Sequence, residues 1–117
     1  KVPHLIVLGH SHCGGIAAYR ARVRDNAPKQ GFIGEWLTLL DGLKVDDEDI
    51  SAYGDKVAFE LAAIRSSLSN LRTFPFVAER ERSGMLDLHG LHFDIATGAL
   101  TALDETSGRF SKMVEAA

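Results

Sequence analysis

Leu5-Ile6-Val7-Leu8-Gly9-His10-Ser11-His12-Cys13-Gly14-Gly15 is the stretch of this sequence that decides the fold. It begins with a continuous apolar run, which is typical of a strand covered on both faces in a parallel sheet. A polar turn follows, and a glycine pair then opens a segment of helical character. We therefore predict an α/β fold with a mainly parallel β-sheet, flanking α-helices and a C-terminal antiparallel hairpin.

The composition is that of one globular domain. The chain has 117 residues, of which 45% are hydrophobic and 25% charged, so we expect a single α/β domain over residues 1–117. The net charge of −3 gives no attraction to nucleic acid or to an anionic membrane, and we expect neither as a partner. The single cysteine cannot form an internal disulfide, which favours a reducing compartment, by default the cytoplasm.

Apolar residues recur at helical spacing after the opening strand. The first helix begins at Gly14 and carries small residues where it would lie close to the sheet. The second, from Phe32 to Leu43 around Trp36, has an apolar face broad enough to meet a partner subunit, although packing in the core is the favoured interpretation. The third runs from Asp55 to about Arg72. Because the residue before a proline avoids the helical region, we expect Pro75 to end this helix and residues 73–76 to be extended.

The last part of the chain has strand character. Residues 85–95 nearly alternate apolar and polar side chains, and a change of phase at Gly90 predicts a bulge or a close backbone approach. Residues 96–98 predict a tight turn into a strand at 99–103, which gives a hairpin at the sheet edge. We expect a short terminal helix from Ser107 to about Glu115.

Candidate chemistry gathers on the turn after the opening strand. Ligands of open α/β sheets bind beyond the carboxyl ends of the strands, which is where His10 and Cys13 lie. The His-x-x-Cys spacing lets an imidazole and a thiolate converge on one metal ion. Gly14 and Gly15 allow a close backbone approach, and the N-terminus of the following helix stabilises a thiolate. The residues alone leave three interpretations open: a pair of metal ligands, a reactive cysteine, or a small buried cysteine beside a histidine that is hydrogen-bonded to the backbone.

Several segments together resemble one family. Gly9-His10-Ser11-His12-Cys13-Gly14-Gly15 resembles the second metal motif of the β-class carbonic anhydrases. Residues 64–77 resemble that family's long helix and its exit, and residues 84–90 and 93–98 resemble its last strands. In this order the similar segments extend over nearly the whole chain.

The resemblance implies a zinc enzyme that interconverts carbon dioxide and bicarbonate. His10 and Cys13 would be two of three zinc ligands, and Gly14 and Gly15 would lie against the substrate. Zinc would lower the pKa of a bound water, and the resulting hydroxide would attack carbon dioxide. The family assembles as dimers or larger homo-oligomers, so the resemblance also implies a homo-oligomer.

One part of the family pattern does not occur in this sequence. The family's Cys-x-Asp-x-Arg motif lies upstream of the apolar strand and supplies the third ligand and an Asp-Arg pair, and this sequence begins after that point. We therefore expect the chain to be the C-terminal portion of a longer domain. Some members also bind regulatory bicarbonate through a tyrosine, and the corresponding residue here, Phe93, has no hydroxyl.

The remaining histidines are weaker candidates. His12 is the nearest possible substitute for the third ligand, but a turn residue facing away is the favoured interpretation. His89 and His92 lie three residues apart on what we expect to be an edge strand, so their side chains should point to opposite faces, as surface or backbone-bonded histidines.

Two other functions remain possible. One is a catalytically silent module for folding or assembly that needs the upstream segment. The other is a thiol enzyme that uses Cys13 as its nucleophile.

Overall fold

The structure, a computed structural model, describes residues 2–25 and 40–114 of the chain. The expected second helix, with Trp36 on its apolar face, lies mostly outside these ranges. Within the described residues no helix has the length and apolar character needed to cross a membrane.

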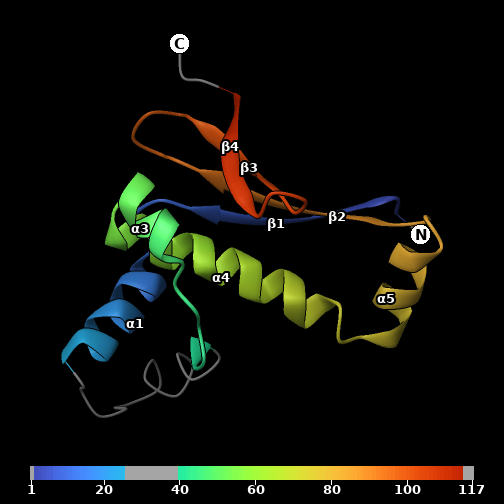
Figure 1. Cartoon of the computed structure of the whole chain (residues 1–117), viewed down its shortest axis with the longest axis horizontal. Helices are drawn as coiled ribbons and strands as arrows, with labels where there is room; N and C mark the ends of the chain where they lie inside the picture. Colours follow the sequence, from blue (N-terminus) through green and yellow to red (C-terminus); the bar gives the residue numbers. More distant parts are fainter. Residues whose placement is uncertain (1, 26–39, 115–117) are drawn as a thin grey trace.

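A four-stranded sheet and four helices make up the described fold (Figure 1). In chain order the elements are β1 (His4–His10), α1 (Gly14–Asp25), α3 (Asp47–Tyr53), α4 (Asp55–Leu71), α5 (Pro75–Arg82), β2 (Asp87–Phe93), β3 (Leu100–Asp104) and β4 (Arg109–Val114). The strand order is β1-β2-β3-β4; β1 and β2 pair in parallel, and the other two pairings are antiparallel. The predicted α/β class is confirmed, with a mixed sheet.

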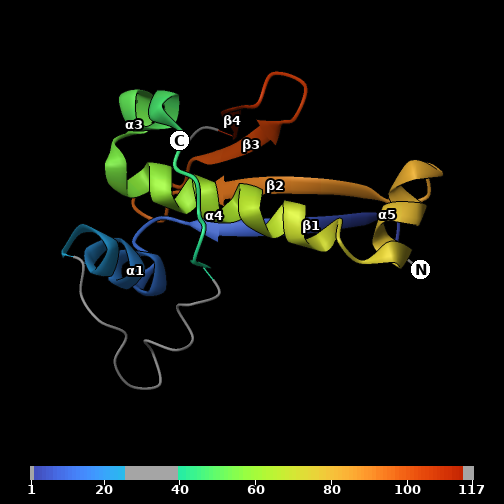
Figure 2. The same cartoon turned by 60° about the horizontal axis from the view of Figure 1, so that its bottom comes forward.

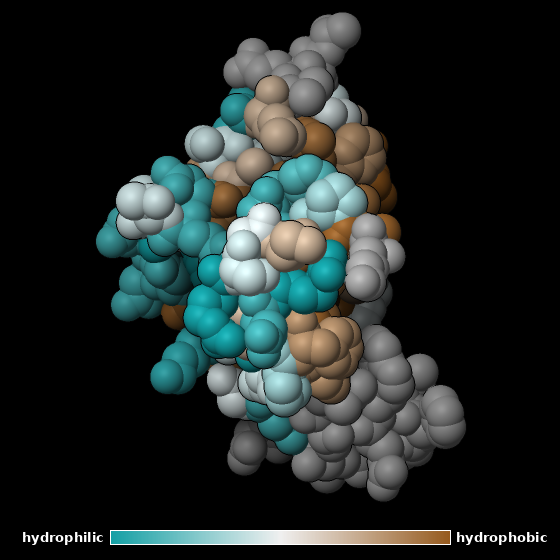
Figure 3. Space-filling view, turned by 90° about the vertical axis from the view of Figure 1, so that its right-hand side faces the viewer, coloured by the Kyte–Doolittle hydropathy of each residue, from teal (hydrophilic) through white to brown (hydrophobic). Residues whose placement is uncertain are grey.

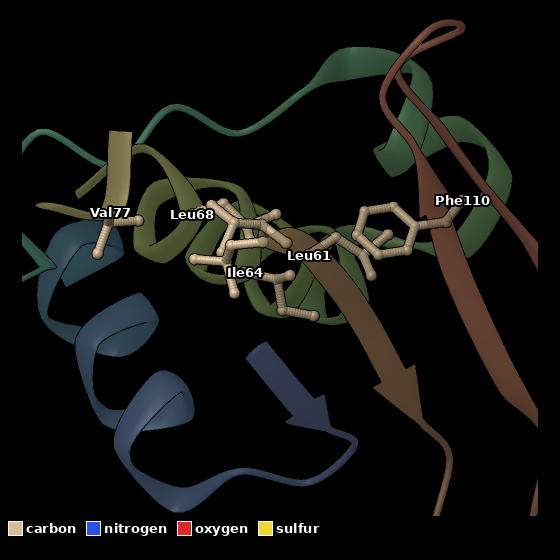
Figure 4. Close-up of a cluster of buried hydrophobic side chains, with 7 residues drawn as sticks. Leu61, Ile64, Leu68, Val77 and Phe110 are labelled. Carbon is tan, nitrogen blue, oxygen red and sulfur yellow. The ribbon is translucent and has the colours of Figure 1, made fainter. Parts of the chain in front are cut away.

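Helix α4 lies along β1 and β2 and covers one face of them (Figure 2). Its sequence is rich in alanine, leucine and other strong helix formers, and Asp55 places a carboxylate in the first turn. Leu61, Ile64 and Leu68 follow at helical spacing and are each at most 2% exposed. Figure 4 shows these three side chains in a row, with Val77 of α5 near one end and Phe110 of β4 near the other.

The exit from α4 follows the proline rule only in part. Phe74, the residue before Pro75, is extended with φ −79° and ψ 121°, as predicted. Thr73, Pro75 and Phe76 were expected to be extended as well. Thr73 instead lies in a turn, with its N–H bonded to the Asn70 oxygen. Pro75 and Phe76 open α5, because the fixed φ of proline suits the first turn of a helix.

Two glycines allow α4 to approach the sheet closely. A Cβ added at Gly9 of β1 would lie 2.6 Å from Ile64 Cδ1, and one added at Gly90 of β2 would lie 2.9 Å from Ile64 Cγ2. These distances are too short for real Cβ contacts. Of the two possibilities predicted at Gly90, close backbone approach is therefore confirmed, and β2 pairs with β1 without a bulge there.

The second face of β1 is open in the described structure. Ile6 and Leu8 point away from α4 and are 54% and 60% exposed, although a strand of this type is expected to be covered on both faces. Phe76 and Met85, at the α5 end of the molecule, are also more than half exposed. Figure 3 shows hydrophobic side chains among hydrophilic ones at that end.

The sequence prediction was wrong for the C-terminus and for the place of β2. Instead of a terminal helix, β4 forms an antiparallel hairpin with β3 and buries Phe110. Gly108, with φ 74°, closes the turn before β4, and pairing with β3 outweighs the weak helical preference of this segment. Because β3 and β4 extend the sheet, β2 is an interior strand and not an edge strand.

Replacing Gly90 by alanine should destabilise the fold. The added methyl group would meet Ile64 Cγ2 and Leu68 Cδ1 at 2.9 and 3.0 Å, and overpacking of this kind costs about 1–3 kcal/mol. Urea unfolding of Gly90→Ala against the unmodified chain measures the loss. Gly14→Ala is the control, because nothing lies within 4 Å of a Cβ added there. Equal stability of the two variants would contradict the packing argument.

Candidate functional site

The end of β1 places the candidate ligands on a short turn. His10 is the last residue of β1, and Gly14 is the first residue of α1. Between them, His12 has a positive φ of 58°, which turns the chain sharply from the strand into the helix. His10 and Cys13 therefore lie where the sequence predicted, at the carboxyl end of a parallel strand and the start of a helix.

A hydrogen bond determines which ring nitrogen of His10 can act as an acceptor or a ligand. Its Nδ1 lies 2.8 Å from the backbone oxygen of Ser11. Because a carbonyl oxygen only accepts, Nδ1 donates and Nε2 of the neutral ring carries the lone pair. This is the arrangement by which a backbone carbonyl orients a metal-binding histidine.

His10 and Cys13 line the same cavity of about 360 Å³. Its walls are mostly apolar and include Val7, Leu8 and Ile16. Cys13 is half-buried and is not in a disulfide. The cavity can thus bring an imidazole nitrogen and a sulfur together beside apolar surface.

The turn is tied to the end of β2 through Ser11. Its backbone N–H donates to the Phe93 oxygen at 2.9 Å, and its buried hydroxyl accepts the Ile95 N–H at 2.9 Å. The same hydroxyl donates to Asp94 Oδ1 at 3.3 Å. Asp94 also accepts the Ala96 N–H at 2.9 Å, and this bond is the largest cause of a lowered pKa of Asp94.

A buried acid and base lie beside the cavity. His92 Nε2 is 2.8 Å from Glu60 Oε1, and the two side chains are only 7% and 3% exposed. His92 was predicted to be a surface or backbone-bonded histidine, and that was wrong, since β2 is interior and turns His92 toward α4. Glu60, which also lines the cavity of His10 and Cys13, was not predicted. Its position among the apolar residues of α4 was a signal that it is buried and paired.

The other histidines stay apart from this site. His89 lies on the opposite face of β2 from His92, as predicted, and its Nε2 is 3.0 Å from His4 Nδ1. His12 is exposed, with its Nδ1 3.1 Å from Lys56 Nζ. Among residues 2–25 and 40–114, no group of three or more His, Cys, Asp or Glu side chains is arranged to hold a metal ion.

Comparison with known sequences gives a consistent result. The sequence model of a family described as carbonic anhydrase matches residues 1–100. Beta carbonic anhydrase 3 of Arabidopsis thaliana is 35% identical over 103 residues, which are 84% of this chain and 40% of that protein. Beta carbonic anhydrase 5, chloroplastic, from the same plant is 33% identical over 101 residues, or 80% and 32% of the two chains. The chain spans well under half the length of these relatives.

Solved structures show the same fold. The β-carbonic anhydrase CcaA matches 95% of this chain and 55% of its own with a TM-score of 0.71 at 24% identity. One of two tetrameric β-carbonic anhydrases from Sordaria macrospora matches 97% of this chain and 53% of its own chain, with a TM-score of 0.64 at 24% identity.

The lowered pKa of Asp94 predicts how stability depends on pH. A carboxyl group with a depressed pKa stabilises the fold above the unfolded-state value, 3.8, and this stability is lost as the pH falls through the folded-state pKa. The deficit in the free energy of unfolding of Asp94→Asn, relative to the unmodified chain, should therefore shrink between about pH 7 and about pH 2.5. Urea unfolding across this range measures it. A deficit that does not change with pH would contradict the assignment.

Proposed function

Because this chain belongs to the β-class carbonic anhydrases, we propose that it takes part in the reversible, zinc-dependent hydration of carbon dioxide to bicarbonate, with His10 and Cys13 as two zinc ligands. The observation that carries the proposal is that both side chains line one cavity at the carboxyl end of β1. The lone pair on His10 Nε2, left available by the bond from Nδ1 to Ser11, supports the same assignment.

The donor set suits zinc, which binds imidazole nitrogen and thiolate sulfur in catalytic sites. Zinc, when bound, supplies Lewis acidity that makes water a nucleophile near neutral pH. In this chain His10 would bind through Nε2, and Cys13 would bind as a thiolate stabilised by the N-terminus of α1. The apolar walls suit carbon dioxide, and Gly14 and Gly15 would present backbone N–H groups to bicarbonate.

The described residues offer only two ligands of this set. We propose that residues 1–117 are the C-terminal portion of a longer carbonic anhydrase domain, which supplies the third ligand and the Asp-Arg pair. The match to only 40% of the length of one relative supports this. We also propose a homo-oligomer, supported by the tetrameric relative from Sordaria macrospora. The single cysteine supports a cytoplasmic location.

A second candidate function is a catalytically silent assembly module. Two observations favour it: no group of three metal-binding side chains occurs in the described part of the chain, and Ile6 and Leu8 are exposed on a strand suited to burial. Such a module would use the exposed face of β1 for assembly and would bind zinc weakly.

Zinc affinity of single variants tests the ligand assignment. His10→Ala and Cys13→Ser should each weaken zinc binding at least about tenfold, because each removes a direct ligand. Competition with a chromogenic chelator measures the affinity. His12→Asn is the matched control: asparagine tolerates the positive φ of this position, and zinc binding should not change.

Hydration of carbon dioxide separates the two candidate functions. Stopped-flow assays should be run on this chain and on a longer chain that includes the upstream segment. Hydration activity that requires His10 and Cys13 supports the enzyme. Absence of hydration activity in both chains favours the assembly module.

Alkylation of Cys13 with and without a chelator tests the thiol enzyme. If the thiol reacts only after zinc is removed, Cys13 is a zinc ligand and not a free nucleophile. Unchanged zinc affinity in both ligand variants would overturn the proposed site.

A further inference from the structure

A second cavity is lined by His92, the partner of Glu60, and shares no lining residue with the cavity of His10 and Cys13. Its volume is about 510 Å³, within the range of small-molecule sites. Its lining residues come from helices α3 and α4, from strands β2, β3 and β4, and from the turn between β2 and β3. Its apolar lining residues include Ala52, Val57, Leu61 and Ala99.

His92 lines this cavity with a ring nitrogen that has no partner. Its Nε2 donates to the Glu60 carboxylate at 2.8 Å, so Nδ1 of the neutral ring carries a lone pair. The structure gives Nδ1 no hydrogen-bond partner. Every fully buried side-chain nitrogen or oxygen of the described residues does have one, so Nδ1 is not fully buried. The His92 side chain is 93% buried and lines the cavity, and we take its Nδ1 to face that space.

The charges at the cavity wall favour a neutral ligand. Asp94 and Lys112 both line it and carry opposite charges. The pKa of Asp94 is lowered, chiefly by the Ala96 N–H, so its side chain remains a carboxylate near neutral pH. The carboxylate of Asp94, two residues from His92, would repel an acidic ligand, and the ammonium group of Lys112 would repel a basic one.

We propose that this cavity is a binding site, separate from that of His10 and Cys13, for a small neutral molecule that combines a flat apolar body with one O–H or N–H donor. The donor bonds to His92 Nδ1, and the apolar body packs on Val57, Leu61 and Ala99. Glu60 holds the ring in the tautomer that accepts this bond.

The site would act as an effector site because the Glu60–His92 hydrogen bond links the two cavities: His92 lines one and Glu60 lines the other. Glu60 Oε1 accepts from His92, while Glu60 also lines the cavity of His10 and Cys13. A ligand that bonds to His92 thus lies two hydrogen bonds from that cavity. This consequence does not require the proposed carbonic anhydrase activity, and binding can be measured on metal-free protein.

Phenol and its methyl ether, anisole, test the proposal as matched probes. Both have a flat apolar ring, but only phenol can donate to His92 Nδ1. In metal-free chain, titration with phenol should shift the NMR signals of methyl groups of Ala52, Val57, Leu61 and Ala99 in a saturable way. Anisole should bind about tenfold more weakly, the loss expected for one buried hydrogen bond.

Three variants locate the binding. Ala99→Phe should abolish phenol binding by filling the cavity while the hydrogen-bonding group, His92, is retained. His92→Asn should reduce the preference for phenol over anisole to nearly none, while His89→Asn, the same change on the other face of β2, should leave it intact. If His92→Asn fails to fold, the comparison of phenol with anisole and the Ala99→Phe variant still test the proposal. Absence of saturable shifts, equal binding of the two probes, or binding that survives in Ala99→Phe would overturn the proposal.

Discussion

The contact of Ile64 with Gly9 and Gly90 is the constraint on which the rest of the structure depends. The side chain of Ile64 occupies space that a Cβ on either strand would need. Because both strands lack side chains there, α4 lies close to the backbone of β1 and β2, and the row Leu61, Ile64 and Leu68 is sealed from water. Such close packing adds many small dispersion contacts and fixes the position of the helix on the sheet.

That packing also decides which strand ends meet. β1 and β2 run in parallel in a register that pairs His10 with Phe93, so their carboxyl ends lie together. Ser11 then joins the turn after β1 to the turn after β2 through Phe93, Ile95 and Asp94. The candidate ligands His10 and Cys13 thus sit on a turn that is held at several points, which restricts their geometry before any ligand binds.

The Glu60–His92 pair is the polar exception in this apolar layer. An acidic side chain that is 3% exposed is costly to bury unless it is paired, and His92 supplies the partner. Each member of the pair also lines a different cavity, His92 the larger one and Glu60 the smaller one. One contains His10 and Cys13, and the other presents His92 Nδ1 beside Asp94 and Lys112. A single buried interaction thus satisfies the core and shapes two potential sites.

The sequence by itself determined the α/β class, the long helix from Asp55 and the place of His10 and Cys13 after the first strand. These features depend on local patterns: a continuous apolar run, helical spacing, and a glycine pair after a strand. Only the tertiary structure decided that residues 109–114 form a strand, because the burial of Phe110 depends on its packing in the core with residues of α4, a segment distant in the sequence. The same holds for His92, whose burial depends on β2 being interior and on Glu60, 32 residues away, facing it across the layer. Local propensity contains no information on such pairings, so the candidate ligands could be predicted and their buried neighbours could not.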